Sequence, residues 1–130
     1  MSFAALTGIS PAVLAELKQG RPRTVELTSA HNVITVADVK AGDHLFLTST
    51  DCADLGPGDA GIVVLVNSVA ISMKRTIEFT NPVYFEEREK MAARVQVKFC
   101  GTSSVKQVES RGMGRPVRVD VVKTICFHAL

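Results

Sequence analysis

Near the start of the chain, the order of apolar and polar positions predicts a strand, a helix and a second strand. Residues 3–6 form a short apolar run that we expect to be a strand. Ser10-Pro11 is typical of a helix start, because serine accepts hydrogen bonds from free backbone N–H groups and proline has no N–H to leave unpaired. The helix should end at Gly20, with one apolar face against a sheet. Residues 23–28 then alternate, which predicts a half-buried strand whose polar face is open to chemistry.

Two unbroken apolar runs indicate the centre of the sheet. Residues 45–47 and 62–66 are rich in strand-forming side chains, so we expect strands that are covered on both faces. The segment between them, residues 51–59, has the glycines and proline of a surface turn. Alternation continues after Val66, and this strand should therefore run on, bent, to Arg75.

The second half of the chain contains another helix signal, followed by strands. Asn81-Pro82 is typical of a helix start, and Glu86 lies four residues before Lys90, which together predict an exposed second helix ending near Met91. Alternating apolar residues then predict three strands, over residues 94–99, 104–108 and 117–121.

These elements favour one α+β domain over residues 1–130. Several short strands with two short helices, and no regular βα alternation, are typical of a small mixed β-barrel rather than of a doubly wound sheet. A chain of 130 residues, 46% of them hydrophobic, can form a core large enough to fold as one unit.

The overall charge limits the size of any nucleic-acid site. The chain has 15 basic and 13 acidic residues, a net charge of +2 and a pI near 8.5. This balance is too even for a protein whose whole surface binds nucleic acid. A basic binding site would therefore have to be local.

The cysteine, histidine and aliphatic patterns argue against several classes of protein. The chain has three cysteines, Cys52, Cys100 and Cys126, and they are not closely spaced in sequence. This pattern argues against disulfides and against a zinc site, and it favours a reducing, cytoplasmic location. The three histidines, His31, His44 and His128, also lack the spacing of a metal site. We therefore expect no metal and no cofactor. The longest aliphatic run, residues 62–66, is far shorter than the about 20 residues that span a bilayer, so we expect a soluble protein without membrane association.

Part of the chain resembles a known family. Residues 17–27, Leu-Lys-Gln-Gly-Arg-Pro-Arg-Thr-Val-Glu-Leu, are similar to the helix-end glycine, basic, threonine and glutamate strand of ASCH domains, which belong to the PUA-like superfamily. Residues 39–47 resemble the turn into their central strand, and residues 61–66 resemble the strand that follows. Thr28 stands where ASCH strands place an arginine. The whole chain, including residues 71–75 and 126–130, also resembles a small family of archaeal proteins of unknown function, mostly from methanogens.

The resemblance to PUA-like domains implies RNA or nucleotide binding in a cleft beside the first helix. Four basic residues would contact phosphate, namely Arg21, Arg23, Lys74 and Arg75. Three polar residues would recognise the rest of the ligand, namely Thr24, Glu26 and Asn32. The basic residues beside the helix have a second interpretation, because cations near a helix C-terminus complement its dipole and otherwise face water.

Two further segments have open interpretations. His31-Asn32 follows the polar strand and either lines the same cleft or forms a turn. Residues 111–116, Arg-Gly-Met-Gly-Arg-Pro, suit either a hairpin loop or a flexible basic loop that wraps a nucleic-acid backbone.

The same resemblance offers an enzymatic alternative. Some ASCH-like proteins are small amidohydrolases of acylated cytidine, which would make Thr24 a nucleophile with Glu26 assisting it. Arg21 occupies the position of their activating lysine, and a guanidinium stays protonated, so it cannot act as the general base. Lys74 or Lys18 would have to replace it. The sequence therefore favours binding over catalysis, with a protein-interaction subunit of unknown role as a third alternative.

Overall fold

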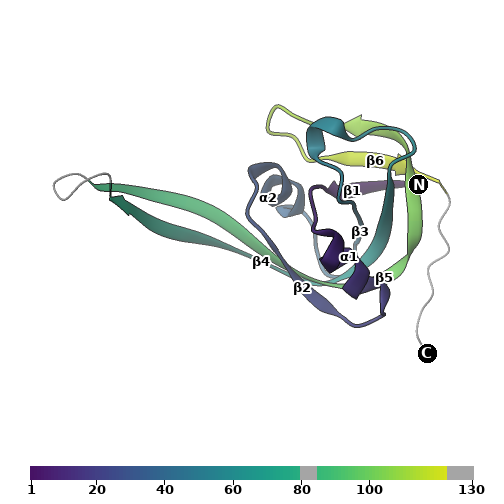
Figure 1. Ribbon diagram of the computed structural model, residues 1–130, viewed down its shortest axis with the longest axis horizontal. Helices are drawn as coiled ribbons and strands as arrows, with labels where there is room; N and C mark the ends of the chain where they lie inside the picture. The colour runs from purple at the N-terminus through teal and green to yellow at the C-terminus, as the bar shows by residue number, and fades with distance from the viewer. Residues whose placement is uncertain (80–84, 123–130) are drawn as a thin grey trace.

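The computed structural model describes the backbone of residues 1–79 and 85–122, and the side chains of residues 1–73 and 91–122. In these residues the elements follow one another along the chain (Figure 1), as β1 (Ser2–Leu6), α1 (Pro11–Lys18), β2 (Arg23–Leu27), α2 (Ala30–Val36), β3 (His44–Leu47), the 3-10 helix η1 (Cys52–Asp54), β4 (Ala60–Phe79), β5 (Phe85–Ser110) and β6 (Arg118–Val121). The expected mixture of helices and strands is confirmed.

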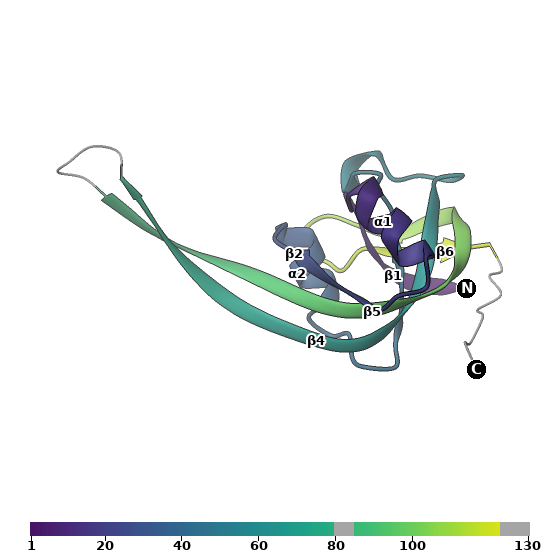
Figure 2. The ribbon, with the colours of Figure 1, turned by 60° about the horizontal axis from the view of Figure 1, so that its bottom comes forward.

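The described strands form one mixed sheet with the order β2-β5-β4-β3-β1-β6. β1 and β3 are parallel, and all the other pairs are antiparallel. β5 also pairs with β6, so the order of pairing returns to a strand that it has already passed through. Register shifts between Val63 and Val64 and between Val66 and Ser68 interrupt the β4–β5 pairing. Such bulges bend a strand pair, and Figure 2 shows β4 and β5 strongly curved.

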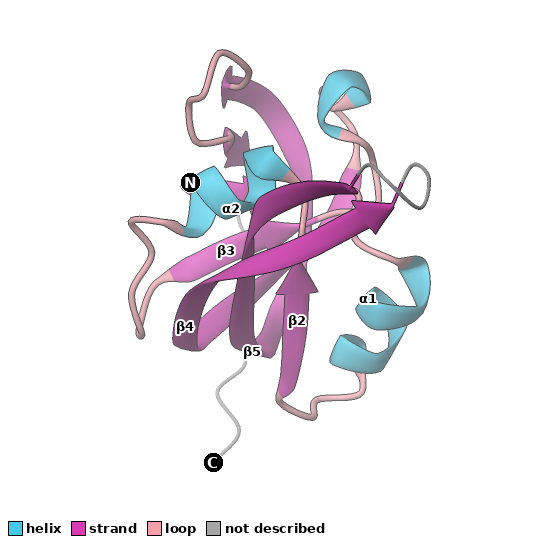
Figure 3. Ribbon diagram, turned by 90° about the vertical axis from the view of Figure 1, so that its left-hand side faces the viewer, coloured by secondary structure: helices cyan, strands magenta, loops and turns pink. Residues whose placement is uncertain are grey.

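Both faces of the central strands are buried, as the unbroken apolar runs predict. On β3 and β4, Leu47 and Val64 belong to one hydrophobic cluster, whereas their neighbours Phe46 and Val63 belong to a second. Leu17 of α1 and Val36 of α2 join the first cluster, so both helices pack on the same core (Figure 3). Alternation within a continuous apolar run thus supplies two cores, one on each side of the strands.

The first helix begins and ends where the sequence predicts, although the Ser10 side chain makes no capping hydrogen bond. Ser10 precedes it, Pro11 is its first residue, and Gly20 follows it with φ of +87°, a conformation that glycine adopts without strain. Leu17 is fully buried on its apolar face. Within the described parts of the chain, no helix has the length and apolar character needed to cross a membrane.

The prediction of a helix from Asn81 to Met91 is wrong for residues 85–91, which belong to β5, while residues 80–84 lie outside the described part. Each of these β5 residues has a partner on β4, for example Met73 for Met91 and Arg75 for Glu89. The local helix signals were a proline and one charge pair, which is worth only about 0.2–0.5 kcal/mol. Cross-strand pairing, which such local signals do not report, decides the conformation.

The second helix is instead α2, where His31 and Asn32 had been considered as turn residues. Its seven residues include Val33, Thr35 and Val36, and β-branched residues have a weak helix preference. These three are buried, so tertiary contacts stabilise a helix that its composition does not favour.

β4 and β5 continue as a two-stranded ribbon far beyond the other strands (Figure 1). β2 ends at Leu27, which pairs with Ala93, and Ala93 pairs in turn with Ile71 of β4. Beyond that row the β4–β5 pairing continues to Phe79 and Phe85. We call residues 72–79 and 85–92 the arm, and the remaining described residues the body. The β4 strand was expected to reach Arg75, and it extends four residues further.

Candidate functional site

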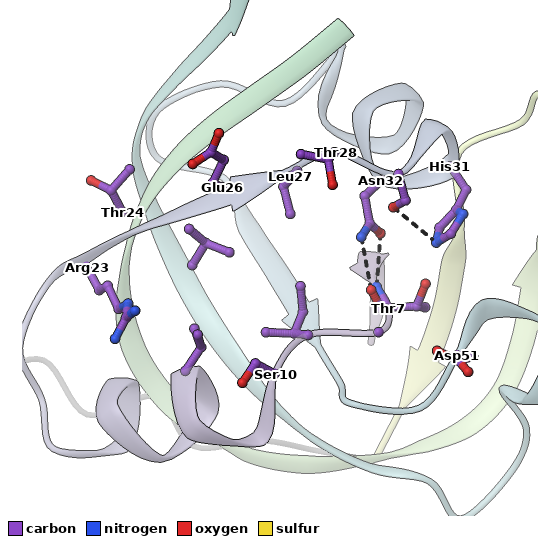
Figure 4. A pocket seen from close by; sticks show the side chains of 15 residues that line it. Thr7, Ser10, Arg23, Thr24, Glu26, Leu27, Thr28, His31, Asn32 and Asp51 are labelled. Atoms are coloured by element: carbon purple, nitrogen blue, oxygen red, sulfur yellow. Dashed lines mark hydrogen bonds between the residues drawn. The ribbon is translucent and has the colours of Figure 1, made fainter. Parts of the chain in front are cut away.

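A cavity of about 550 Å³ lies between β2, the segment that joins β1 to α1, and the beginning of α2 (Figure 4). Its polar lining comes from Thr7, Ser10, Arg23, Thr24, Glu26, Thr28, Ser29, His31, Asn32 and Asp51. The volume is in the range of small-molecule sites, about 300–1,000 Å³.

β2 presents different chemistry on its two sides. Val25 and Leu27 are buried in the core, whereas Thr24 and Glu26 are exposed on the opposite side of the strand. Arg23 points toward α1 (Figure 4), where its guanidinium makes an ion pair with Glu16. The side chain of Arg23 remains 36% exposed. The strand thus directs Arg23 toward α1, whereas the side chains of Thr24 and Glu26 point away from α1 on the other side of the strand (Figure 4).

Asn32 lies at the inner end of the cavity and is 5% exposed. Its amide Nδ2 donates to the carbonyl of Thr7 at 2.9 Å, and its Oδ1 accepts from the backbone N–H of Thr7 at 3.0 Å. The side chain therefore makes the two hydrogen bonds that a neighbouring strand would make. Its principal role in this arrangement is to attach α2 to the end of β1.

The hydroxyl of Thr7 has no hydrogen-bond partner among the described residues, although Thr7 is only 1% exposed. In Figure 4 the side chain of Thr7 points away from Asn32, toward the space between His31 and Asp51. Buried hydroxyl groups nearly always have a partner. An unpaired hydroxyl at the inner end of a cavity therefore marks a position where a ligand or a water molecule can accept or donate a hydrogen bond.

A second hollow, of about 730 Å³, adjoins the first and shares His31 and Asp51 with it. It lies between α2, η1 and the loop that joins β5 to β6. The hairpin interpretation of this loop is confirmed, because it connects two antiparallel strands. Arg111 donates to the carbonyls of Leu55 and Cys52, which fixes the loop against η1.

Comparison with known proteins places the chain in a family. The model of a family described as "Protein of unknown function (DUF473)" matches residues 1–119. The chain belongs to the DUF473 family. It is also 32% identical over 110 residues to the uncharacterized protein MJ0105 of Methanocaldococcus jannaschii, covering 85% of this chain and 68% of that protein. No solved structure matches the chain. Membership of a family of unknown function with an archaeal relative is therefore confirmed, whereas the resemblance to ASCH domains is not confirmed by these comparisons.

The basic residues expected at the site of the DUF473 chain lie in different places. Arg23 lines the cavity, whereas Arg21 is exposed and lies outside its lining. Lys18 lines a separate hollow on the other side of α1. The backbone of Lys74 and Arg75 belongs to the arm, beginning about 10 Å along the strand from the row that contains Leu27. Their side chains lie outside the described residues.

The polar residues expected at the site all line the cavity of the DUF473 chain: Thr24, Glu26 and Asn32. His31, which was expected either there or in a turn, lines it as well. Thr7 and Asp51 also line the cavity, and no sequence pattern marks them as site residues. Thr7 follows β1 and Asp51 follows β3, and these strands are far apart in sequence. The parallel pairing of β1 with β3, which the order of the chain does not reveal, brings the two residues together.

The described residues contain no group of three or more His, Cys, Asp and Glu side chains arranged to hold a metal ion. Among the described cysteines of the DUF473 chain, Cys52 is a half-buried free thiol and Cys100 is buried. Cys126 lies outside the described residues.

Proposed function

We propose that the DUF473 chain binds RNA or a nucleotide in the cavity beside β2, on a small PUA-like barrel. The observation that carries this proposal is the coincidence of two independent features. The strand that resembles the ASCH strand, Arg23–Leu27, forms one wall of a polar cavity of suitable volume. The return of strand pairing to β5 supports the barrel part of the proposal, because closed sheets are paired in this way.

The chemistry of the cavity suits the parts of a nucleotide. A guanidinium has five N–H donors, so Arg23 can contact a phosphate while it keeps part of its interaction with Glu16. Asp51 offers a carboxylate acceptor for an exocyclic amino group of a base. The unpaired Thr7 hydroxyl offers one further donor or acceptor at the inner end.

The ion pair between Arg23 and Glu16 gives a two-sided test. Arg23→Ala removes the phosphate contact and should weaken the binding of a short fluorescent single-stranded RNA by about tenfold. Glu16→Gln frees the guanidinium and should strengthen the same binding. Fluorescence anisotropy at several salt concentrations measures both, and the slope with salt should fall for Arg23→Ala.

The matched control is Arg118→Ala, which removes an exposed arginine on β6, outside the cavity lining. It should bind RNA as the wild-type chain does. Absence of RNA and nucleotide binding at low salt would contradict the proposal, and so would equal losses for Arg23→Ala and Arg118→Ala.

The hydrolase alternative rests on Thr24 and Glu26, which are exposed on the same side of β2. It requires release of acetate from an acylated nucleoside and loss of this activity in Thr24→Ala. Binding without turnover across a panel of acylated nucleosides would favour the binding function over this alternative.

A further inference from the structure

One edge of the arm is open along its whole length. In the body, β4 pairs with β3 over residues 62–65, and Val66 then exchanges hydrogen bonds with Gly42 and Asp43 at 2.8 Å. Beyond Val66, the only strand that pairs with β4 in the described residues is β5. The opposite edge of β4, from Asn67 to Phe79, therefore presents unpaired backbone groups, which can pair with another strand.

An apolar strip also continues from the core onto the arm. The rows Val25–Val95–Val69 and Leu27–Ala93–Ile71 cross the three strands at the end of the body. Beyond Val69 the body no longer buries this strip, and large apolar side chains are exposed: Ile71 at 40%, Met73 at 60% and Met91 at 52%. A two-stranded ribbon alone is at best marginally stable in water. Additional strands beside it would stabilise it by adding backbone hydrogen bonds and cross-strand side-chain contacts.

The charges along the arm indicate what those strands are. The residues between 74 and 90 include four basic and four acidic ones, namely Lys74, Arg75, Arg88 and Lys90, and Glu78, Glu86, Glu87 and Glu89. A nucleic-acid surface needs an excess of positive charge, which this segment lacks. Along β4, in contrast, Lys74 and Glu78 lie two positions before and two positions after Thr76. If two β4 strands run antiparallel with Thr76 opposite Thr76, Lys74 of each strand is therefore opposite Glu78 of the other.

We propose that the arms of two copies of this chain pair edge to edge, with the β4 strands antiparallel about a two-fold axis at Thr76. Lys74 of each copy then lies beside the partner's Glu78, and the two ribbons form one four-stranded sheet. An interface with two-fold symmetry repeats each contact twice. Moving the axis one residue toward the body sets Arg75 beside the partner's Arg75 and removes the Lys–Glu contacts, so the charges select this register.

Charge reversal on β4 tests the register. Lys74→Glu places like charges together at both symmetric contacts, as does Glu78→Lys, and each variant alone should dimerise about tenfold more weakly than the wild-type chain. An equimolar mixture of the two variants restores opposite charges at both contacts, so it should form a heterodimer. Sedimentation velocity of the full chain over a concentration series measures all four samples.

The pairing of β4 with β5 within one chain predicts whether a substitution disturbs the arm itself or only the contact between two copies. Within one chain, Lys74 pairs with Lys90 and Glu78 pairs with Glu86, so each substitution replaces a like-charge pair with an opposite-charge pair inside the ribbon. The arm of each variant should therefore be at least as well formed as in the wild-type chain. Glu86→Lys makes the same charge change on β5, away from the proposed contact, and should leave dimerisation unchanged.

The proposal concerns assembly and does not depend on what the cavity binds. A wild-type chain that is monomeric at every concentration would overturn it. Undiminished dimerisation of Lys74→Glu or Glu78→Lys would overturn the β4 register, as would failure of the mixture to dimerise.

Discussion

The side-chain amide of Asn32 takes the two hydrogen bonds that a neighbouring strand would otherwise make to Thr7. The polar atoms of this side chain are therefore occupied within the fold. The alternation of β2 made Thr24 and Glu26 predictable, since it separates the polar side from Val25 and Leu27. The position of Asn32 at the cavity is predictable, but its hydrogen bonds are not, because they depend on Thr7, which follows β1 and lies 25 residues away.

At the residue scale, Asn32→Ala should strongly destabilise the protein. The substitution leaves the buried N–H and C=O of Thr7 without partners, and each unsatisfied group costs about 1–3 kcal/mol, so we expect the free energy of unfolding to fall by about 2–6 kcal/mol. Urea unfolding followed by circular dichroism measures the change. Asn67→Ala, at an exposed position, is the control. Equal stabilities of the two variants would show that the amide does not hold α2 in place.

At the scale of elements, the strands were more predictable than the second helix. Binary alternation and apolar runs depend only on neighbouring residues, and they located α1, β2, β3 and the body part of β4. The arm and α2 depend on contacts between distant segments. A helix rich in β-branched residues and a strand that begins with five charged residues, 86–90, both contradict their local preferences.

The contact between β3 and the start of β4 gives the prediction at this scale. A Cβ on Gly61 would collide with the ring of Phe46 and with the carbonyl oxygen of Leu47. Gly61→Ala should therefore lower the free energy of unfolding by about 1–3 kcal/mol, because a buried side chain and backbone must move.

The matched control is Gly56→Ala, in the turn before β4, where the nearest atom to an added Cβ is 4.0 Å away. Its melting temperature, measured by differential scanning calorimetry, should change little. Equal melting temperatures of Gly61→Ala, Gly56→Ala and the wild-type chain would show that the close approach of β3 and β4 does not limit stability.

At the scale of the whole molecule, the described side chains of the arm lie outside the two hydrophobic clusters and outside the lining of the cavity. The two hydrophobic clusters lie in the body, and the cavity is lined by body residues. The mixed α+β class was predictable because it depends on the number and kind of elements. The arm was not, because the Asn81-Pro82 sequence and the spacing of Glu86 and Lys90 are typical of a helix.

Replacement of residues 73–91 by Asn-Gly should leave the body folded, since this dipeptide favours a tight turn between the Ser72 and Ala92 partners. We expect the RNA affinity of the cavity to be retained and dimerisation to be lost. Sedimentation velocity and fluorescence anisotropy on the same sample measure both. Loss of both properties with a cooperative melting transition intact would show that the arm contributes to the cavity.

The position of β1 between β3 and β6 has a consequence for how the chain folds during synthesis. Phe3 pairs with Val119, and Leu6 pairs with Leu47, so the first strand needs partners from the middle and from the far part of the described chain. Pairing over such distances in sequence slows folding. On the ribosome, the apolar β1 strand must wait until about 120 residues have been made before both its edges are paired. Until β6 has been made, one edge of β1 lacks its partner strand, and an unpaired strand edge favours aggregation.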